Sequence, residues 1–117
     1  MTVQECYEKM GGDYADVTNR LRTDERIKKF LLKVADDMSF NNLCENLATH
    51  NIAEAFRAAH TLKGVCLNLS ITKLYRSACD MTEALRGQTE YKAEYEPILA
   101  RVKEDYALTV DCIKNID

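Results

Sequence analysis

Apolar residues recur at spacings of three and four along almost the whole chain, which is the period of an amphipathic helix. The sequence has only 4 glycines and 1 proline, and its β-branched residues are nowhere concentrated in alternation. No segment therefore has the pattern of a strand. Because short connections join the amphipathic segments, the chain is predicted to be all-α, with an antiparallel four-helix bundle core and short additional N-terminal helices.

Polar capping residues mark the expected helix starts. A Ser, Thr, Asp or Asn side chain at an N-cap accepts a hydrogen bond from a backbone N–H of the first turn. The predicted N-caps are Thr2, Asp13, Thr23, Ser39, Asn51 and Ser70. The pair Gly11-Gly12 ends the first helix and Gly87 ends the helix after Ser70, as C′ residues. Pro97 should kink the last helix or mark its real start.

The apolar stripe changes faces near Ser39. At ~100° per residue, the stripe of Phe40, Leu43 and Leu47 falls opposite the stripe that precedes it. A straight helix cannot bury both faces in one small bundle, so we expect one helix over 24–37 and another over 40–49. The preceding stripe, expected to be buried, consists of Ile27, Phe30, Leu31, Val34 and Met38.

Three further stripes complete the expected core. The segment that ends at about Leu69 presents Ile52, Ala55, Phe56, Ala59, Leu62, Cys66 and Leu69. The following segment presents Ile71, Leu74, Tyr75, Ala78, Met81 and Leu85. The final segment presents Tyr91, Tyr95, Ile98, Val102, Tyr106, Val110 and Ile113.

Composition excludes several classes of protein. With 117 residues the chain fits one domain, 1–117, and its net charge of -3 argues against nucleic-acid binding. No apolar run approaches the ~20 residues of a membrane span, and no signal peptide is recognisable. The 5 cysteines are odd in number and form no CxxC pair, so we interpret them as small buried hydrophobes in a reducing compartment. A cytoplasmic monomer is the expectation.

His60 stands at the border of a predicted buried stripe, at or near the surface. Its neighbours one turn away are Phe56 and Gly64, and Arg57 and Lys63 lie three residues from it. Glycine inside a helix costs about 1 kcal/mol relative to alanine, but here it clears space beside the imidazole. Lys63 supplies a positive charge suited to phosphate, and a neutral imidazole nitrogen is a nucleophile. These residues suggest phosphoryl acceptance, although an ordinary surface histidine remains the alternative.

The stretch "HTLKGVCLNLS" resembles the signature of histidine-containing phosphotransfer (HPt) domains. The residues that match are His60, Leu62, Lys63, Gly64 and Leu69. The segments "GGDYADVTNRL", "FLLKVADDMSFNNLCENL", "FRAAH" and "LYRSACDMTEALRG" resemble the corresponding helices of stand-alone HPt modules. The resemblance covers nearly the whole chain and implies a four-helix bundle with a phosphorylatable His60.

Three residues depart from this signature. Ser70 stands where the family usually has glycine, and Val65 and Leu67 are larger than the common Ser, Ala or Gly. Because Ser70 is small and can cap a helix, we expect the turn to survive. Leu67 lies on the His60 side of its helix, where it narrows the approach or adds apolar contact for a partner.

The resemblance implies a phosphoryl carrier rather than an enzyme. His60 would accept a phosphoryl group from the phospho-aspartate of a receiver domain, in a hybrid histidine kinase or response regulator, and pass it to another receiver domain. Lys63 would offset the negative charge of the phosphoryl group, and Gly64 would admit the receiver's active site. No cofactor is expected on this chain, because Mg²⁺ should belong to the receiver and no ATP-binding motif is present. Phe56, Ala59, Lys63 and Leu67 are candidate docking residues, to which the N-terminal helices either add contacts or merely cover the bundle.

Two other functions compete with this interpretation. The chain could be a helical protein-interaction module without phosphoryl chemistry, a degenerate copy in which His60 is incidental. It could also be a metal-binding bundle, but such bundles use Glu-x-x-His pairs. Leu47 and Arg57 stand three residues before His50 and His60, where that motif needs glutamate.

Overall fold

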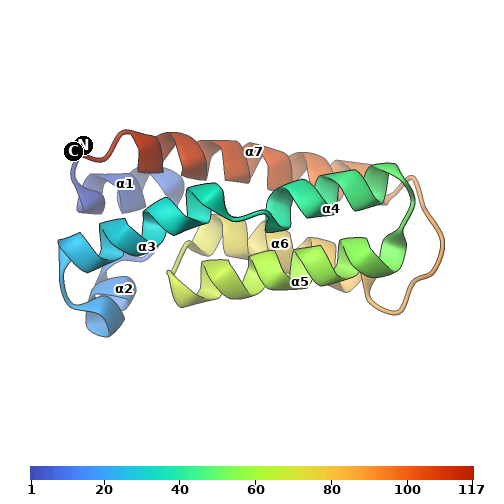
Figure 1. The fold of residues 1–117 in the computed structure, drawn as a ribbon, viewed down its shortest axis with the longest axis horizontal. Coiled ribbons are helices and arrows are strands. Elements are labelled where there is room, and N and C mark those ends of the chain that lie inside the picture. Colours follow the sequence, from blue (N-terminus) through green and yellow to red (C-terminus); the bar gives the residue numbers. More distant parts are fainter.

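The computed structural model describes residues 1–117 and contains seven helices and no strand. The consecutive helices α3 and α4 form one side of a four-helix antiparallel bundle with α5, α6 and α7 (Figure 1). The short helices α1 and α2 lie at the end of the bundle where α3 begins. This architecture confirms the predicted fold class. The helices are α1 (Val3–Met10), α2 (Tyr14–Leu21), α3 (Asp24–Asp36), α4 (Ser39–Ala48), α5 (Ile52–Asn68), α6 (Thr72–Leu85) and α7 (Tyr95–Lys114).

The break that the shifted stripe predicts lies between α3 and α4. The chain leaves the helix after Asp36 and re-enters it at Ser39. The predicted cap is wrong, because Ser39 is the first residue of α4 rather than its N-cap. Asp37, two residues before Ser39, takes the capping role instead. Its carboxylate accepts a hydrogen bond of 2.8 Å from the Ser39 N–H. Four other predicted N-caps are confirmed, because each side chain accepts a hydrogen bond from a backbone N–H in the first turn of its helix. These residues are Thr2, Asp13, Thr23 and Asn51.

Two residues of the predicted α3 stripe are not buried. Phe30 is 40% exposed and Met38 is 56% exposed. Helix α3 packs against α7 and against the short helices α2 and α1, so its buried strip is narrower than its apolar face. Met38 lies in the break itself, where the helical period does not apply. Other stripe residues are half-buried at the bundle edges: Phe40, Phe56, Tyr75, Tyr91, Ile98, Tyr106 and Val110.

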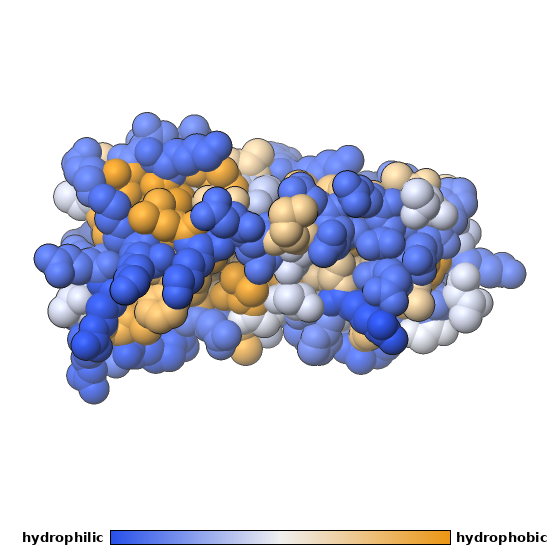
Figure 2. All heavy atoms as spheres, in the orientation of Figure 1, coloured by the Kyte–Doolittle hydropathy of each residue, from blue (hydrophilic) through white to orange (hydrophobic).

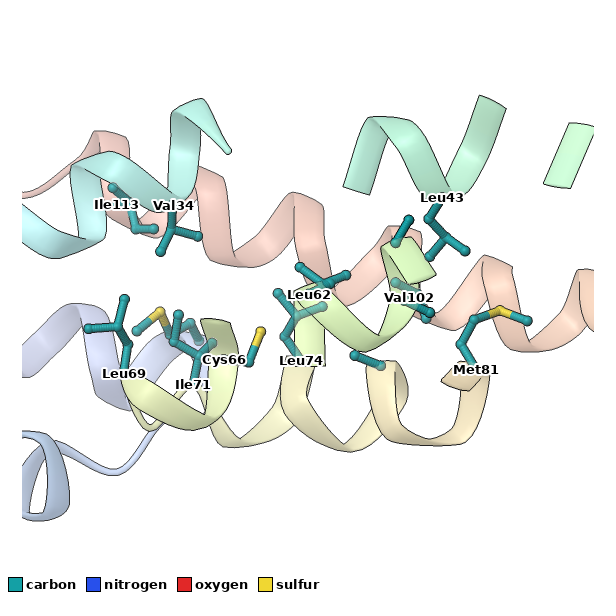
Figure 3. Close-up of a cluster of buried hydrophobic side chains, with 14 of the residues drawn as sticks. Val34, Leu43, Leu62, Cys66, Leu69, Ile71, Leu74, Met81, Val102 and Ile113 are labelled. Atoms are coloured by element: carbon teal, nitrogen blue, oxygen red, sulfur yellow. The ribbon is translucent and has the colours of Figure 1, made fainter. Parts of the chain in front are cut away.

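A single cluster of 27 buried apolar residues runs through the bundle and draws on all seven helices. Figure 3 shows Leu62 of α5 and Leu74 of α6 meeting between their helices, with Val102 of α7 in the same cluster. Helix α1 gives its whole apolar face to this core: Val3, Cys6, Tyr7 and Met10. The N-terminal helices were expected either to add docking contacts or to cover the bundle. Helix α1 covers the end of the bundle, because its apolar face is buried in the core and none of it is left for a partner.

The last helix begins where its proline indicates. Pro97 is the third residue of α7, within the first turn, where a backbone N–H has no partner inside the helix. Tyr91 consequently lies before the helix, and its ring stacks on His50 with centroids 4.1 Å apart. Nowhere does the chain gather three or more His, Cys, Asp or Glu side chains that could hold a metal ion. None of the helices combines the length and the apolar character that crossing a bilayer requires.

Ser70 ends α5 instead of capping α6, so that prediction is wrong. Its φ of +55° lies in the left-handed region, which favours glycine. The Ile71 N–H bonds to the Cys66 carbonyl and the Ser70 N–H to the Leu67 carbonyl, which together form a Schellman motif. This geometry would suit the glycine that the resembling signature has at this position, and the turn survives with serine.

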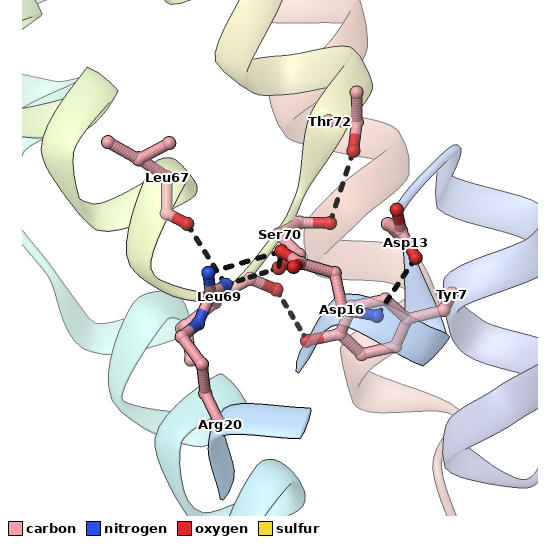
Figure 4. A network of polar contacts seen from close by, with 8 residues as sticks. All are labelled: Tyr7, Asp13, Asp16, Arg20, Leu67, Leu69, Ser70 and Thr72. Carbon is pink, nitrogen blue, oxygen red and sulfur yellow. Dashed lines mark hydrogen bonds and ion pairs between the residues drawn. The ribbon is translucent and has the colours of Figure 1, made fainter. Parts of the chain in front are cut away.

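The Ser70 side chain is tied to helix α2 (Figure 4). Its hydroxyl donates to the carboxylate of Asp16 at 2.6 Å and accepts from the guanidinium of Arg20. Arg20 also donates to the Leu67 carbonyl at 3.2 Å, and Tyr7 donates to the Leu69 carbonyl at 2.8 Å. The last carbonyls of α5 therefore find donors in α1 and α2, and the hydroxyl that glycine lacks fastens α2 to the end of α5.

All five cysteines are free thiols; Cys6, Cys66 and Cys112 are buried, and Cys44 and Cys79 are half-buried. Burial raises the pKa of both Cys6 and Cys66 from 9.0 to about 12. Burial disfavours the thiolate, so these side chains remain neutral in the folded protein well above pH 9.

Alkaline pH is therefore expected to destabilise the fold through these two thiols. Their folded pKa exceeds the unfolded value, so their contribution is complete below pH 9 and is lost as the pH rises toward 12. At pH 10 each should cost about 1 kcal/mol of unfolding free energy. Urea unfolding of the reduced protein at pH 7.5 and pH 10 measures the difference. A Cys66→Ala variant should show a smaller drop than wild type, and equal drops would refute this explanation.

Candidate functional site

Helix α5 carries His60 in its middle, well away from either end. Asn51 caps the helix by accepting from the Glu54 N–H. The buried face of α5 consists of Ile52, Ala55, Ala58, Ala59, Leu62 and Cys66, and it packs against α4 and α6. His60 lies outside this face and its side chain is exposed, as the helical projection predicts. The imidazole is thus held by a rigid element and open to solvent.

Gly64 has no packing role within the chain. A Cβ atom built at Gly64 meets nothing within 4 Å, so no neighbouring helix requires a glycine there. The helix interior accepts the lower propensity of glycine, about 1 kcal/mol below alanine, without any gain from close helix packing. The space that the glycine leaves opens outward, one turn along the helix from His60. This geometry favours the approach of another molecule over a purely structural explanation.

An open pocket of 430 Å³ lies directly beside the imidazole. It is lined by Phe56, Arg57, His60, Thr61 and Arg86. The Phe56 and His60 ring centroids are 6.0 Å apart, and the Arg86 guanidinium lies 5.2 Å from the Phe56 ring centroid. Arg57 and Arg86 each pair with a glutamate three residues earlier, at 2.9 Å to Glu54 and 3.0 Å to Glu83. Two basic side chains therefore line the pocket with the histidine, and Lys63, which does not line it, stands three residues along α5 from His60.

Arg86 was not among the residues that the sequence indicates for the site. It is the C-cap residue of α6, and its position in the chain is remote from His60. A register argument could have found it, because residues equally far from the turn at Leu69–Ile71 lie opposite one another in an antiparallel helix pair. That places the end of α6 beside the first half of α5, and a long side chain can reach back to Phe56.

The candidate docking residues divide by exposure. Leu67 is 54% exposed, and Phe56 is half-buried beside His60. Ala59 is 0% exposed, so it cannot contact a partner, and its prediction as a docking residue is wrong. Ala59 belongs to the buried stripe of α5, and its short side chain does not extend beyond the neighbouring helix.

An apolar groove of 270 Å³ lies between α2, α3 and the second half of α5. Its lining residues are Leu21, Phe30, Lys33, Val34, Asp37, Val65, Asn68 and Leu69. Figure 2 shows apolar surface gathered over the α3 half of this face, whereas the half over α4 is largely hydrophilic. Phe30, which is 40% exposed, and Val65, which is half-buried, help to form this groove. The groove and the His60 pocket share helix α5.

One protein-family model matches most of the chain. The family model for the Hpt domain matches residues 27–111, from α3 to the last turns of α7. The chain belongs to the Hpt domain family. Hpt domains are phosphocarriers of two-component relays, without kinase motifs, and they interact with receiver domains. Searches of curated proteins and of solved structures gave no significant match.

The Hpt match includes the bundle and His60, but it begins after α1 and α2. In this Hpt domain those two helices complete the core at one end and form the Asp16–Arg20–Ser70 contacts. The serine that departs from the Hpt signature is therefore held by a segment that lies outside the matched region.

Proposed function

We propose that His60 is the phosphoacceptor of this Hpt domain. The observation that carries the proposal is an exposed imidazole in mid-helix, beside a glycine with open space above it and in a pocket that Arg57 and Arg86 also line. An imidazole nitrogen attacks the phosphorus of a receiver aspartyl phosphate. The P–N bond forms as the P–O bond to the carboxylate breaks, and the reverse reaction on a second receiver passes the group on.

The chain contributes position and charge to this reaction. Phosphoryl transfer depends on in-line placement and on neutralisation of the transferred charge. Arg57 and Arg86 supply positive charge in the His60 pocket, Lys63 adds a charge three residues along the helix, and Gly64 admits the receiver's active site. The Mg²⁺ ion belongs to the receiver, and the Hpt domain itself uses no cofactor. We place the carrier in the cytoplasm as a monomer.

The receiver docks on the α5 face that includes Phe56 and Leu67. The apolar groove bounded by Phe30 and Val65 extends this surface toward α2 and α3. The apolar contacts contribute affinity for the receiver. The basic residues near His60 fix the orientation of the acidic receiver site.

A phosphotransfer assay tests the proposal. The pure protein is incubated with phosphorylated receiver domains and examined for an acid-labile, base-stable phosphoryl group, with His60→Gln alongside. We expect label on the wild type and a loss of at least about 1000-fold in the variant, because glutamine offers no nucleophilic nitrogen. His60 is exposed, so both proteins should show the same unfolding midpoint. Label that persists on His60→Gln would move the acceptor elsewhere, and an unlabelled wild type would leave a helical interaction module.

A further inference from the structure

Glu83 joins the basic residues of the site from the facing helix. Its carboxylate accepts from both the Nε and the terminal nitrogen of Arg86, at 3.3 and 3.0 Å. The hydrogen bond and charge of Arg86, and then the charge of Lys63, lower the pKa of Glu83. Glu83 is thus an anion paired with Arg86, which lines the His60 pocket.

The position of Arg86 is set by two contacts. Glu83 holds the guanidinium fork on one side, and the Phe56 ring supports it on the other, 5.2 Å from the ring centroid. Phe56 is in turn 6.0 Å from the His60 ring. The remaining acidic neighbour in this region, Glu54, is paired with Arg57 at 2.9 Å.

We propose that Glu83 is a positioning residue that sets how tightly the site retains a phosphoryl group, by competing with that group for Arg86. The proposal rests on His60 as the phosphoacceptor. In the free carrier Glu83 holds Arg86 beside the pocket; in the phosphorylated carrier the guanidinium turns from the carboxylate to the phosphoryl oxygens.

The exchange of Arg86 between the two anionic groups is close to balanced, so it is chemically feasible in both directions. Carboxylate and phosphoryl groups both offer the paired oxygens that a guanidinium fork recognises. The Glu83–Arg86 pair is exposed, and such pairs contribute little to stability, so Arg86 can leave it at small cost. The carboxylate of Glu83 then remains free to take Arg86 back. This competition for the guanidinium keeps the phosphoryl group transferable and prevents the carrier from acting as a trap.

The experiment compares the transfer equilibrium between wild type and Glu83→Gln. Each carrier is mixed with one phosphorylated receiver domain, and the ratio of phosphorylated carrier to phosphorylated receiver is measured at equilibrium. Glu83→Gln should raise the equilibrium constant toward phospho-His60 about threefold, which is the size expected for a charge near an exposed site. Glu83→Asp, which keeps the charge, should stay close to wild type. Glu104→Gln makes the same charge change on α7 and should not shift the equilibrium.

A double variant separates this mechanism from a general charge effect. In an Arg86→Gln background, Glu83→Gln should have little further effect, because the residue acts through Arg86. An unchanged equilibrium in Glu83→Gln, or an equal shift in both backgrounds, would overturn the role of Glu83 while His60 still accepts label. Absence of label on the wild type would instead overturn the proposed function together with this inference.

Discussion

Gly64→Gln is expected to make the protein more stable and to remove most of its phosphotransfer activity. Glutamine is a good helix former, and the space above Gly64 holds no atom of this chain within 4 Å. The substitution should therefore raise the unfolding free energy by about 0.5–1 kcal/mol. The same side chain would stand in the path of the receiver. Because displacement by about 1 Å can cost 100-fold, transfer should fall by at least about 100-fold.

Gly64→Ala provides the graded comparison. It should give a similar gain in stability, since alanine is the best helix former, but a smaller loss of transfer because one methyl group intrudes less. Urea unfolding and the initial rate of transfer from a phosphorylated receiver measure the two effects. Transfer at the wild-type rate in Gly64→Gln would show that the open space is not an approach path. A loss of stability would show that the helix needs the glycine for its own packing.

The bundle was readable from the sequence because its signals are local. The opposed stripes on either side of Ser39 require a break, and the break lies between Asp36 and Ser39. Gly87, with φ of +69°, follows the C-cap of α6 as predicted. Each of these features depends on residues within a few turns of one another, so periodicity and capping are sufficient to find them.

Features that depend on distant partners were not readable in this way. Ser70 has the local signature of an N-cap, but donors from α1 and α2 stabilise the end of α5 and hold the serine in a left-handed conformation. Phe30 belongs to the α3 stripe by period, yet whether it is buried depends on how many helices surround α3. Arg86 reaches the His60 pocket only because α6 folds back along α5. These three errors share one cause, which is that tertiary packing decides what a local pattern leaves open.

Two leucines on α5 separate folding from partner binding. Leu62 is 1% exposed at the centre of the core, whereas Leu67 is 54% exposed on the His60 side of the same helix. Leu62→Ala removes buried methyl groups and leaves a cavity, so it should lower the unfolding free energy by about 2–5 kcal/mol. Leu67→Ala should change it by less than about 0.5 kcal/mol, because an exposed leucine buries little surface on folding.

The effects on transfer should have the opposite order. Below its lowered unfolding midpoint, the folded Leu62→Ala protein presents an unchanged surface and should transfer at a rate near wild type. Leu67→Ala should raise the receiver concentration needed for half-maximal transfer by about 3- to 10-fold and leave the maximal rate unchanged, because the lost apolar contact contributes binding rather than chemistry. Transfer rates measured over a range of receiver concentrations, with urea unfolding of both variants, distinguish the two residues. An unchanged half-maximal concentration in Leu67→Ala would remove this face of α5 from the docking surface. In that case the bulky residue that departs from the family signature would have no contact to explain its exposure.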